Sequence, residues 1–341
     1  MRLSRRALLI GGGAFGAAGL AGAAWAQRPQ ALSEPTPIAV QATRIDSLDT
    51  GAPDQRRFGA LAFRSGLDLQ SSVDAFGGLS GLVRSADGRE LVSVTDSAHW
   101  FTARVVAENG RLTGLADTLL APMLDADGRP LRRTRYYDTE GLTIAGGTAY
   151  VSVERNPALL RFDWAKDGVQ ARGRVIAPPP DARDLPRNQG LEAIGVAPAR
   201  SPLAGALVAV AERAEEGERA PTRGYILTGS RRGSFQLARS DDFDITDLAF
   251  LPSGEVLVLE RRFSLLRGVA ARLRRLAPDA IRPGALADGP VIFETAATHR
   301  IDNMEGLALH QEGGETVVTM VSDNNFSTLQ RTILLEFVLV A

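Results

Sequence analysis

One stretch of sequence decides the fold: Tyr137-Asp138-Thr139-Glu140-Gly141-Leu142-Thr143-Ile144-Ala145-Gly146-Gly147-Thr148-Ala149-Tyr150-Val151-Ser152-Val153-Glu154-Arg155-Asn156. Two runs of alternating apolar residues flank a Gly-Gly pair, a pattern typical of a β-hairpin. Because hairpin strands are antiparallel, the start of the first strand and the end of the second lie at the same edge. The stretch therefore predicts that Glu140 and Glu154 lie close together.

The same hairpin pattern occurs five times along the chain. The equivalent positions are Ser80, Glu140, Glu192, Thr246 and Glu305, with spacings of 60, 52, 54 and 59 residues. Periods of this length indicate a repeat architecture. Each period has room for four short strands, which is the size of one blade of a β-propeller.

We therefore predict an all-β fold, a propeller of four-stranded blades. Five blades are counted, although residues 40–70 leave room for part of a sixth. The last repeat ends without an outer strand, whereas residues 57–69 alternate as a strand outside the repeats. We expect this N-terminal strand to join the C-terminal blade and close the ring, which removes open sheet edges.

The N-terminal segment has the features of an export signal. Residues 4–9, Ser-Arg-Arg-Ala-Leu-Leu, form a twin-arginine signature, and an apolar Gly/Ala-rich run leads to a small-residue cleavage site at residues 24–26. A permanent membrane anchor is the alternative, but the run is rich in glycine and ends in a processing site. We expect residues 1–26 to be removed, residues 27–39 to be a flexible lead-in, and residues 40–341 to form a single domain in the periplasm or outside the cell, without stable membrane insertion.

Composition excludes several classes of function. Removal of residues 1–26 takes away three of the 39 basic residues, which leaves 36 against 40 acidic residues and a net charge of −4. This is no basic footprint for nucleic acid. The chain has no cysteine, so it has neither disulfides nor thiolate metal sites. We expect a monomer held together by its core.

In a propeller, the repeated hairpins are the innermost strands, and their shared edge faces one mouth of the central channel. This prediction places many carboxylates together, and they repel one another unless cations intervene. The candidate metal ligands are Asp96, Asp138, Glu140, Glu154, Glu192, Glu212, Glu260, Glu305 and Asp323. Two kinds of cation are available: a hard metal ion such as Ca²⁺, or the arginines that directly follow three of the acids, Arg155, Arg213 and Arg261.

Two interpretations of this acidic ring remain open. Glu and Arg at fixed positions in a repeat can form structural ion pairs between blades. Alternatively, carboxylates and arginines at one mouth concentrate ionic ligands, with the arginines binding phosphate oxygens and the carboxylates holding a metal. The irregular positions Ser80, Thr246, Asp96 and Asp323 are where we expect a specialised site. The segments 110–134 and 212–223 are longer than a tight blade needs, so they are candidates for substrate selection.

An ordered set of motifs resembles the bacterial family called esterase-like activity of phytase, or phytase-like domain. The motifs are Phe76-Gly77-Gly78-Leu79-Ser80-Gly81-Leu82, Asp138-Thr139-Glu140-Gly141-Leu142, Glu154-Arg155, Gly190-Leu191-Glu192-Ala193, Glu212-Arg213 and Ser322-Asp323-Asn324-Asn325-Phe326. The resemblance implies an exported β-propeller and, by the family's name, phosphoric-ester hydrolysis; propeller phytases are calcium enzymes.

Two functional hypotheses follow. In the first, the protein is a calcium-assisted phosphoric-ester hydrolase that takes a small anionic or phosphorylated substrate and needs no organic cofactor. Its candidate catalytic residues are Glu140, Glu192, Glu305, Arg155, Arg213 and Arg261. In the second, the protein is a non-catalytic propeller that binds a ligand or a protein partner in the cell envelope.

Overall fold

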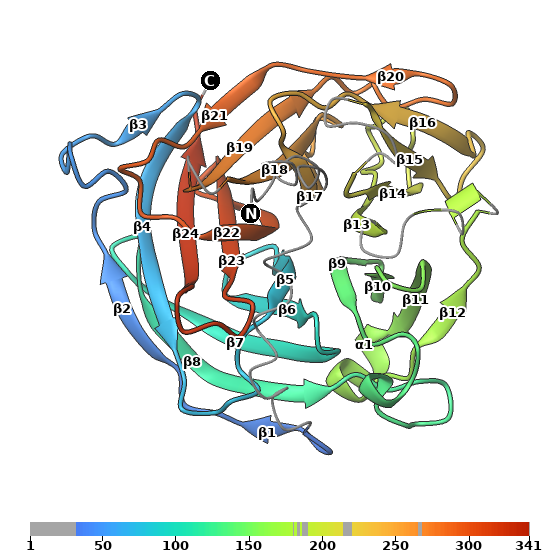
Figure 1. Cartoon of the computed structure of the whole chain (residues 1–341), viewed down its shortest axis with the longest axis horizontal. Coiled ribbons are helices and arrows are strands. Elements are labelled where there is room, and N and C mark those ends of the chain that lie inside the picture. Colours follow the sequence, from blue (N-terminus) through green and yellow to red (C-terminus); the bar gives the residue numbers. More distant parts are fainter. Residues whose placement is uncertain are drawn as a thin grey trace, which may run out of the picture.

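The computed structural model describes residues 32–179, 181–182, 185, 190–213, 220–264 and 268–340. Five sheets are arranged around a central channel as the blades of a propeller (Figure 1). The prediction of an all-β propeller with five blades is confirmed. Residues 1–31, which contain the predicted export signal and the first part of the lead-in, lie outside the described residues.

In the first four blades the chain runs from the innermost strand outward. Blade 1 consists of β5 (Leu79–Arg84), β6 (Glu90–Thr95), β7 (His99–Glu108) and β8 (Arg111–Pro122), with β1 (Thr36–Pro37) at its outer edge. Blade 2 consists of β9 (Thr139–Ala145), β10 (Thr148–Val153), β11 (Ala158–Asp163) and β12 (Arg174–Ile176). Blade 3 consists of β13 (Leu191–Val196), β14 (Leu207–Ala211), β15 (Thr222–Ile226) and β16 (Gly233–Leu237), with β20 (Leu286–Ala287) outside it. Blade 4 consists of β17 (Asp244–Phe250), β18 (Val256–Ser264), β19 (Gly268–Leu276) and β21 (Val291–Glu294).

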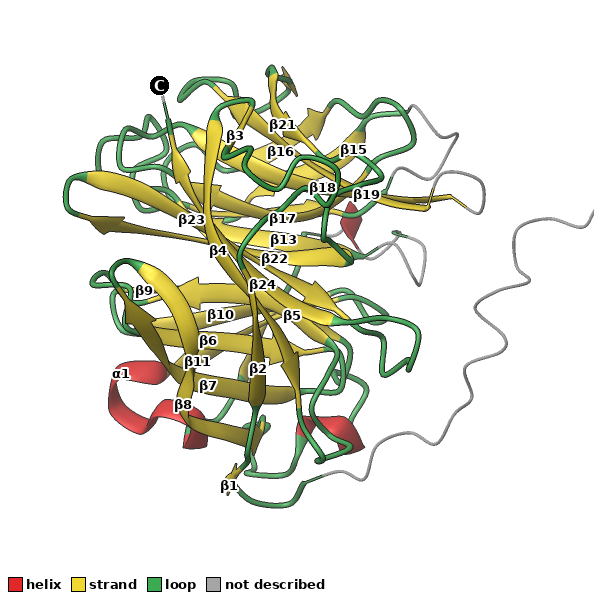
Figure 2. Ribbon diagram, turned by 90° about the vertical axis from the view of Figure 1, so that its left-hand side faces the viewer, coloured by secondary structure: helices red, strands yellow, loops and turns green. Residues whose placement is uncertain are grey.

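The fifth blade combines strands from both ends of the described chain. It consists of β22 (Asn303–Glu312), β23 (Glu315–Asp323) and β24 (Thr332–Leu339), followed outward by β4 (Leu61–Gln70) and β2 (Gln41–Ile45), with β3 (Arg57–Phe58) beside β4. β4 pairs antiparallel with β24, with Leu61 opposite Leu339 and Leu69 opposite Thr332. These strands lie toward the viewer in Figure 2. Residues 41–70 therefore add to the fifth sheet and do not form part of a sixth blade.

Two segments differ from the sequence expectation. The first half of residues 110–134 is not an insertion, because Arg111–Pro122 is the outer strand β8; a single 3-10 turn, η1 (Leu131–Arg133), follows it. In blade 2, the outer strand is limited to Arg174–Ile176, because the short helix α1 (Trp164–Asp167) and the turn η2 (Gly168–Gln170) occupy the preceding residues.

Apolar side chains hold the blades together pairwise. Five clusters of buried residues fill the five interfaces between neighbouring blades; one packs Trp100 of blade 1 against Phe162 of blade 2, with ring centroids 5.1 Å apart. The burial of apolar surface at every interface stabilises the ring as a unit.

Close packing between blades explains why the repeated Glu-Gly-Leu motif contains glycine. A Cβ atom added at Gly141 would lie 2.1 Å from the carbonyl oxygen of Glu192 in the next blade. The equivalent Gly81 and Gly306 would meet backbone atoms of their neighbouring blades at 2.2 and 2.3 Å. Inner strands of adjacent blades therefore approach too closely for a side chain at these three positions. This close approach brings the polar residues that precede the glycines together around a narrow channel.

The inner strands of all five blades line a cavity of about 220 Å³. Most of the lining residues are apolar, and they include Leu82, Leu142, Ile194, Leu248 and Leu307. Among the described residues, no helix has the length and apolar character to cross a membrane.

Candidate functional site

Three acids are held in the same way at the end of the second strand of their hairpins. In each case the backbone N–H of the acid donates to a carbonyl at the start of the first strand: Asp96 to Gly78 (3.0 Å), Glu154 to Asp138 (2.9 Å) and Glu212 to Gly190 (3.0 Å). The repeat thus fixes these side chains at one edge of the hairpins, beside the residues of the first strand.

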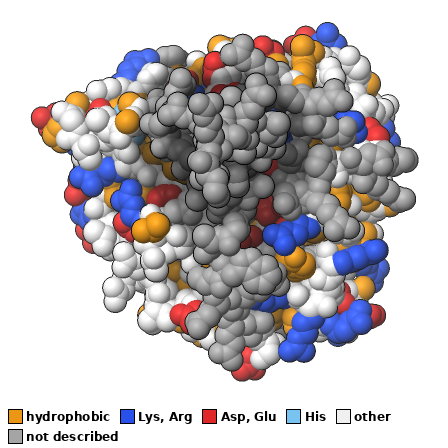
Figure 3. Space-filling model, in the orientation of Figure 1, with side chains coloured by type: hydrophobic (Ala, Val, Ile, Leu, Met, Phe, Trp, Pro, Cys, Tyr) orange, Lys and Arg blue, Asp and Glu red, His pale blue; other side chains and the backbone are white. Residues whose placement is uncertain are grey.

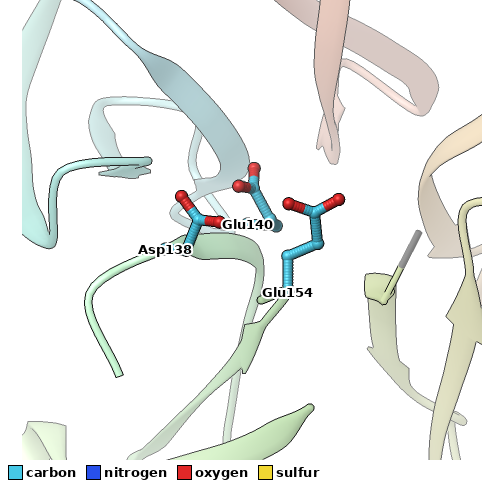
Figure 4. Close-up of side chains that lie close together, drawn as sticks. All are labelled: Asp138, Glu140 and Glu154. Atoms are coloured by element: carbon cyan, nitrogen blue, oxygen red, sulfur yellow. The ribbon is translucent and has the colours of Figure 1, made fainter. Parts of the chain in front are cut away.

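Five carboxylates of blades 2 and 3 converge at this edge in two sets of three. One set is Asp138, Glu140 and Glu154, and the other is Glu154, Glu192 and Glu212; within each set, one ligand oxygen per residue lies within 4.8 Å of the others. Glu154 belongs to both sets. Figure 4 shows Asp138, Glu140 and Glu154 extending from the hairpin of blade 2 into the space between the blades. Acidic side chains also border the centre of the face in Figure 3.

The acids of these two sets differ in their partners. Glu140 Oε2 accepts a hydrogen bond from Ser80 Oγ of blade 1 (2.9 Å). Glu192 is only 6% exposed, yet within the described ranges its carboxylate makes neither a hydrogen bond nor an ion pair. A buried carboxylate without a partner is costly unless a cation or a proton neutralises it.

Burial and mutual repulsion raise the pKa values of the acids at this mouth. Burial, with repulsion from Asp138 and Glu212, raises the pKa of Glu154 to about 9. Burial and the neighbouring carboxylates hold the pKa values of Glu140 and Glu192 well above their usual range. Burial also raises the pKa values of Asp138 and Glu212, although nearby arginines oppose the shift.

Blades 1 and 5 contribute acids with the same kind of shift. Burial raises the pKa of Asp96 to about 7, and Asp138 adds to the shift. Burial raises the pKa values of Glu305 and Asp323 to about 8, against the charge of Arg261. Eight of the nine predicted ligands therefore carry protons more readily than ordinary carboxyl groups, which is typical of a cluster with too few cations.

The three predicted arginines have different positions. Arg261 lies between two acids, with Nε 2.9 Å from Glu305 and Nη2 3.3 Å from Glu212. Arg155 is half exposed, and it contacts Asp138 (2.9 Å) and the hydroxyl of Tyr137 (2.9 Å). Arg213 is also partly exposed, and it pairs with Asp244 through Nε (2.9 Å).

The register of blade 4 corrects the prediction for Glu260. Asp244 is opposite Arg261 and Ile245 is opposite Glu260, so Arg261 takes the place that Glu154 and Glu212 have in their hairpins. Because side chains alternate along a strand, Glu260 points to the other face of the sheet. There it is fully buried and pairs with Arg272 and Arg274, the latter at 2.8 Å through Nε. Glu260 therefore lies in a structural ion-pair cluster and not in the ring.

Two irregular positions have structural hydrogen bonds. Thr246 is buried, and its hydroxyl donates to the carbonyl of Met304 in blade 5 (3.2 Å). The Ser80 hydroxyl donates a hydrogen bond to Glu140 across the boundary between blades 1 and 2. Both substitutions therefore link neighbouring blades where the repeat elsewhere has a carboxylate.

Sequence reasoning missed Asp244, which accepts hydrogen bonds from Arg213 and Arg239 beside the ring. A signal was available, because Asp244 precedes Thr246 by two residues as Asp138 precedes Glu140. It also missed Asp247, which occupies the place of the motif glycine and accepts a hydrogen bond from the backbone N–H of Leu307 (2.7 Å) in blade 5.

The residues present fit a hard divalent cation. The converging ligand atoms are all carboxylate oxygens, the type that Ca²⁺ prefers. The arginine pairs are concentrated on Asp138, Glu212, Asp244 and Glu305. The described residues leave five acids of the ring without an ion pair: Asp96, Glu140, Glu154, Glu192 and Asp323. Of these, only Glu140, Glu154 and Glu192 belong to the converging sets, so the described acids that converge without an arginine partner lie in blades 2 and 3. The predicted loop 212–223 borders this sector, but its residues 214–219 are outside the described chain.

Several solved structures have a remote similarity to the chain. A gluconolactonase from Xanthomonas campestris is 17% identical, with a TM-score of 0.45 over 89% of this chain and 99% of that chain. A GH62 α-L-arabinofuranosidase catalytic domain from Coprinopsis cinerea is 12% identical, with a TM-score of 0.46 over 83% of this chain and 99% of that one. A protein of unknown function from Dyadobacter fermentans is 12% identical, with a TM-score of 0.42 over 92% and 99%.

No curated protein sequence matches the chain. The family model described as "Phytase-like: Esterase-like activity of phytase" matches residues 74–326, which contain all five hairpins and the acidic ring that they build. The chain belongs to this phytase-like family.

Proposed function

We propose that the protein is an exported, calcium-assisted phosphoric-ester hydrolase that acts at the acidic mouth of the channel. The observation that carries this proposal is the pair of carboxylate sets that share Glu154 in blades 2 and 3. The family description, with its esterase-like activity, supports the same class of reaction.

In this proposal, Asp138, Glu140, Glu154, Glu192 and Glu212 are the residues that would hold Ca²⁺. A bound calcium ion supplies positive charge that attracts phosphate oxygens and makes a water molecule more acidic. The carboxylates balance that charge and fix its position. Asp138, Glu192 and Glu212 are buried and Glu140 and Glu154 are partly buried, and this reduced contact with water strengthens the electrostatic interactions inside the site.

The arginines have separate roles in this mechanism. Arg155 and Arg213 have 49% and 44% of their side chains exposed, so their guanidinium groups are accessible at the mouth. Either one can form paired hydrogen bonds with phosphate oxygens and stabilise the charge that develops during hydrolysis. Arg261 is already bound to Glu212 and Glu305. We assign it to neutralising those acids, and Glu305 to holding Arg261, with neither contacting the substrate.

The expected location is outside the cytoplasm. The twin-arginine signature at residues 4–9 and the small residues at 24–26 support export. Extracellular and periplasmic fluids expose a protein to more free calcium than the cytosol does, which suits a site of moderate affinity.

A non-catalytic propeller is the second candidate function. It is favoured by the ion pairs Arg155–Asp138, Arg213–Asp244 and Arg261–Glu305, because such pairs stabilise a ring without doing chemistry. In that case the mouth binds a ligand or a protein partner, and no ester is hydrolysed.

Hydrolysis of a panel of phosphomonoesters, with added Ca²⁺ and with chelator, tests the two functions. We expect activity that needs calcium and that falls at least about a hundredfold in Glu140→Gln and Glu192→Gln. Glu255→Gln is the matched control, because Glu255 pairs with Arg275 outside the ring. Activity that survives both the chelator and the two ring substitutions would refute the metal mechanism, and no activity on any ester would favour the binding module.

A further inference from the structure

A second charged feature lies on the outer part of blade 2, two strands away from the channel. A groove of about 590 Å³ is bounded by β11, α1, η2 and β12, and by the turn at Ala126. Its cationic side chains are Arg161, Lys166, Arg172 and Arg174; its acids are Asp163 and Asp167. In Figure 3, Lys and Arg side chains gather at the lower right of the face, where Figure 1 shows these elements.

Two of the arginines face each other across paired strands. Arg161 is directly opposite Arg174 in the antiparallel ladder of β11 and β12. Directly opposed residues of an antiparallel pair have their side chains on the same face, and like charges there are destabilising. Nothing in the core requires this arrangement, because both arginines are exposed.

None of the four cations is neutralised within the described chain. Arg161, Lys166, Arg172 and Arg174 make no ion pair and no side-chain hydrogen bond with another described residue. By contrast, Arg129, on the neighbouring turn, pairs with both Asp125 and Asp127. The groove therefore concentrates positive charge that its own two acids leave uncompensated.

The backbone below these side chains is well packed. Trp164 of α1 packs against the buried Trp100, with the rings tilted by 58° and their centroids 4.8 Å apart. Ala171 is fully buried, and the N–H of Gly173 donates to the carbonyl of Leu124 (2.8 Å), which ties the approach to β12 to the turn after β8. The groove is thus held in shape before any ligand arrives, which lowers the entropy cost of binding.

We propose that this groove binds an anion that has several phosphate groups. Guanidinium groups bind phosphate oxygens with paired hydrogen bonds, and an anion between Arg161 and Arg174 would relieve their repulsion. A volume of about 590 Å³ is larger than one phosphate needs and lies in the range of ligand pockets. The site is separate from the channel, so the proposal does not depend on hydrolysis or on calcium. The phosphates can belong to a soluble polyanion or to lipid headgroups.

Calorimetric titration with tripolyphosphate, and sedimentation with vesicles, test this proposal on the full chain in chelator, which removes calcium from the channel. We expect tripolyphosphate to bind at least about tenfold more tightly than orthophosphate, because several cations share its charges. The double variant Arg161→Gln/Arg174→Gln should weaken tripolyphosphate binding at least about tenfold. The variant should also unfold at a higher temperature than the wild type in ligand-free, low-salt buffer, because one repulsion is removed.

Arg200→Gln/Arg231→Gln is the matched control, because it removes two exposed charges outside the groove. If the protein binds tripolyphosphate but no vesicles, and this binding requires the groove arginines, the ligand is a soluble polyanion. If it binds phosphatidic acid vesicles but not phosphatidylcholine vesicles, again only with the groove arginines, the ligand is a lipid surface. Equal weakening by the control pair, equal affinity for orthophosphate, or no binding to either probe would overturn the proposal.

Discussion

Replacement of Glu154 by glutamine should have opposite effects without and with calcium. Glu154 is the one carboxylate that belongs to both ligand sets, and it lies beside Asp138 and Glu212. Without a cation, ionisation of Glu154 would add a charge to a repulsive cluster, which is why its pKa is raised. In the proposed calcium site, the same carboxylate is a ligand for the metal. Glutamine keeps the shape of the side chain and removes the charge.

The size of the first effect follows from the pKa of Glu154, which rises from 4.5 to about 9 on folding. An acid with a raised pKa binds its proton more tightly in the folded state, so stability is highest at low pH and falls as pH rises from the unfolded pKa to the folded one. For Glu154 alone this corresponds to a loss of about 5 kcal/mol at pH 8, against about 1 kcal/mol at pH 5. Asp138 and Glu154 can share a proton, which relieves part of the repulsion, so we expect Glu154→Gln to stabilise the chelated protein by about 2 kcal/mol at pH 8.

Urea unfolding at pH 5 and pH 8, in chelator and in calcium, measures both effects. In chelator, the stabilisation by Glu154→Gln should be near zero at pH 5 and largest at pH 8. In calcium, the wild type should gain stability and the variant should gain much less, because ligand binding stabilises the folded state in proportion to its affinity. Glu255→Gln should show neither pattern. A Glu154→Gln protein that is less stable than wild type in chelator at pH 8, and that gains as much stability from calcium, would refute this account of the ring.

Three further predictions concern the same ring and its support. Calcium should bind at least about tenfold more weakly at pH 6 than at pH 8 by titration calorimetry, because the metal must displace protons from acids with raised pKa values; affinity independent of pH would contradict protonated ligands. Gly141→Ala should destabilise the protein by about 3 kcal/mol or more in urea, because its new Cβ lies 2.1 Å from the carbonyl of Glu192, whereas an effect below about 1 kcal/mol would show that the strands can separate. Glu260→Gln should lower the free energy of unfolding by about 3–5 kcal/mol, because it breaks buried ion pairs with Arg272 and Arg274, and it should leave calcium affinity unchanged. A variant that keeps native stability but loses calcium binding would show that Glu260 is a ligand of the ring.

The sequence predicted the blade architecture because its signals are local and repeated. Alternating runs, Gly-Gly turns and a recurring acidic motif each describe one hairpin, and a period of 52 to 60 residues fixes how many strands a unit contains. The pairing of β4 with β24 followed from counting strands, since one repeat lacked a partner and one N-terminal strand lacked a repeat.

The exact members of the ring could not be counted from the sequence. Blade 4 contains Glu260-Arg261 where blades 2 and 3 contain Glu154-Arg155 and Glu212-Arg213, so matching by residue type aligns Glu260 with the acids. The backbone pairing of the strands gives a different alignment. Each of these hairpins has a bulge, and the turn between its two strands differs in length from one hairpin to the next. A shift of one residue moves a side chain to the opposite face. Matching by residue type therefore gave the wrong position for Glu260, because the strand register decides to which face its side chain points.

This shift in register also explains why the ring is not symmetrical. Arg261 places a cation inside the ring on blade 4, and it pairs with the acids on either side, Glu212 and Glu305. In blades 2 and 3, no described arginine forms an ion pair with Glu140, Glu154 or Glu192, and burial with mutual repulsion raises the pKa values of these acids. Within the described chain, the ring thus has one sector that Arg261 neutralises and another sector in which Glu140, Glu154 and Glu192 have no ion pair. We infer that the proposed calcium site lies in blades 2 and 3, where the motif is most regular. Of the four irregular positions, Ser80 and Thr246 make contacts between blades, and the expectation of a specialised site at Asp96 or Asp323 stays a prediction.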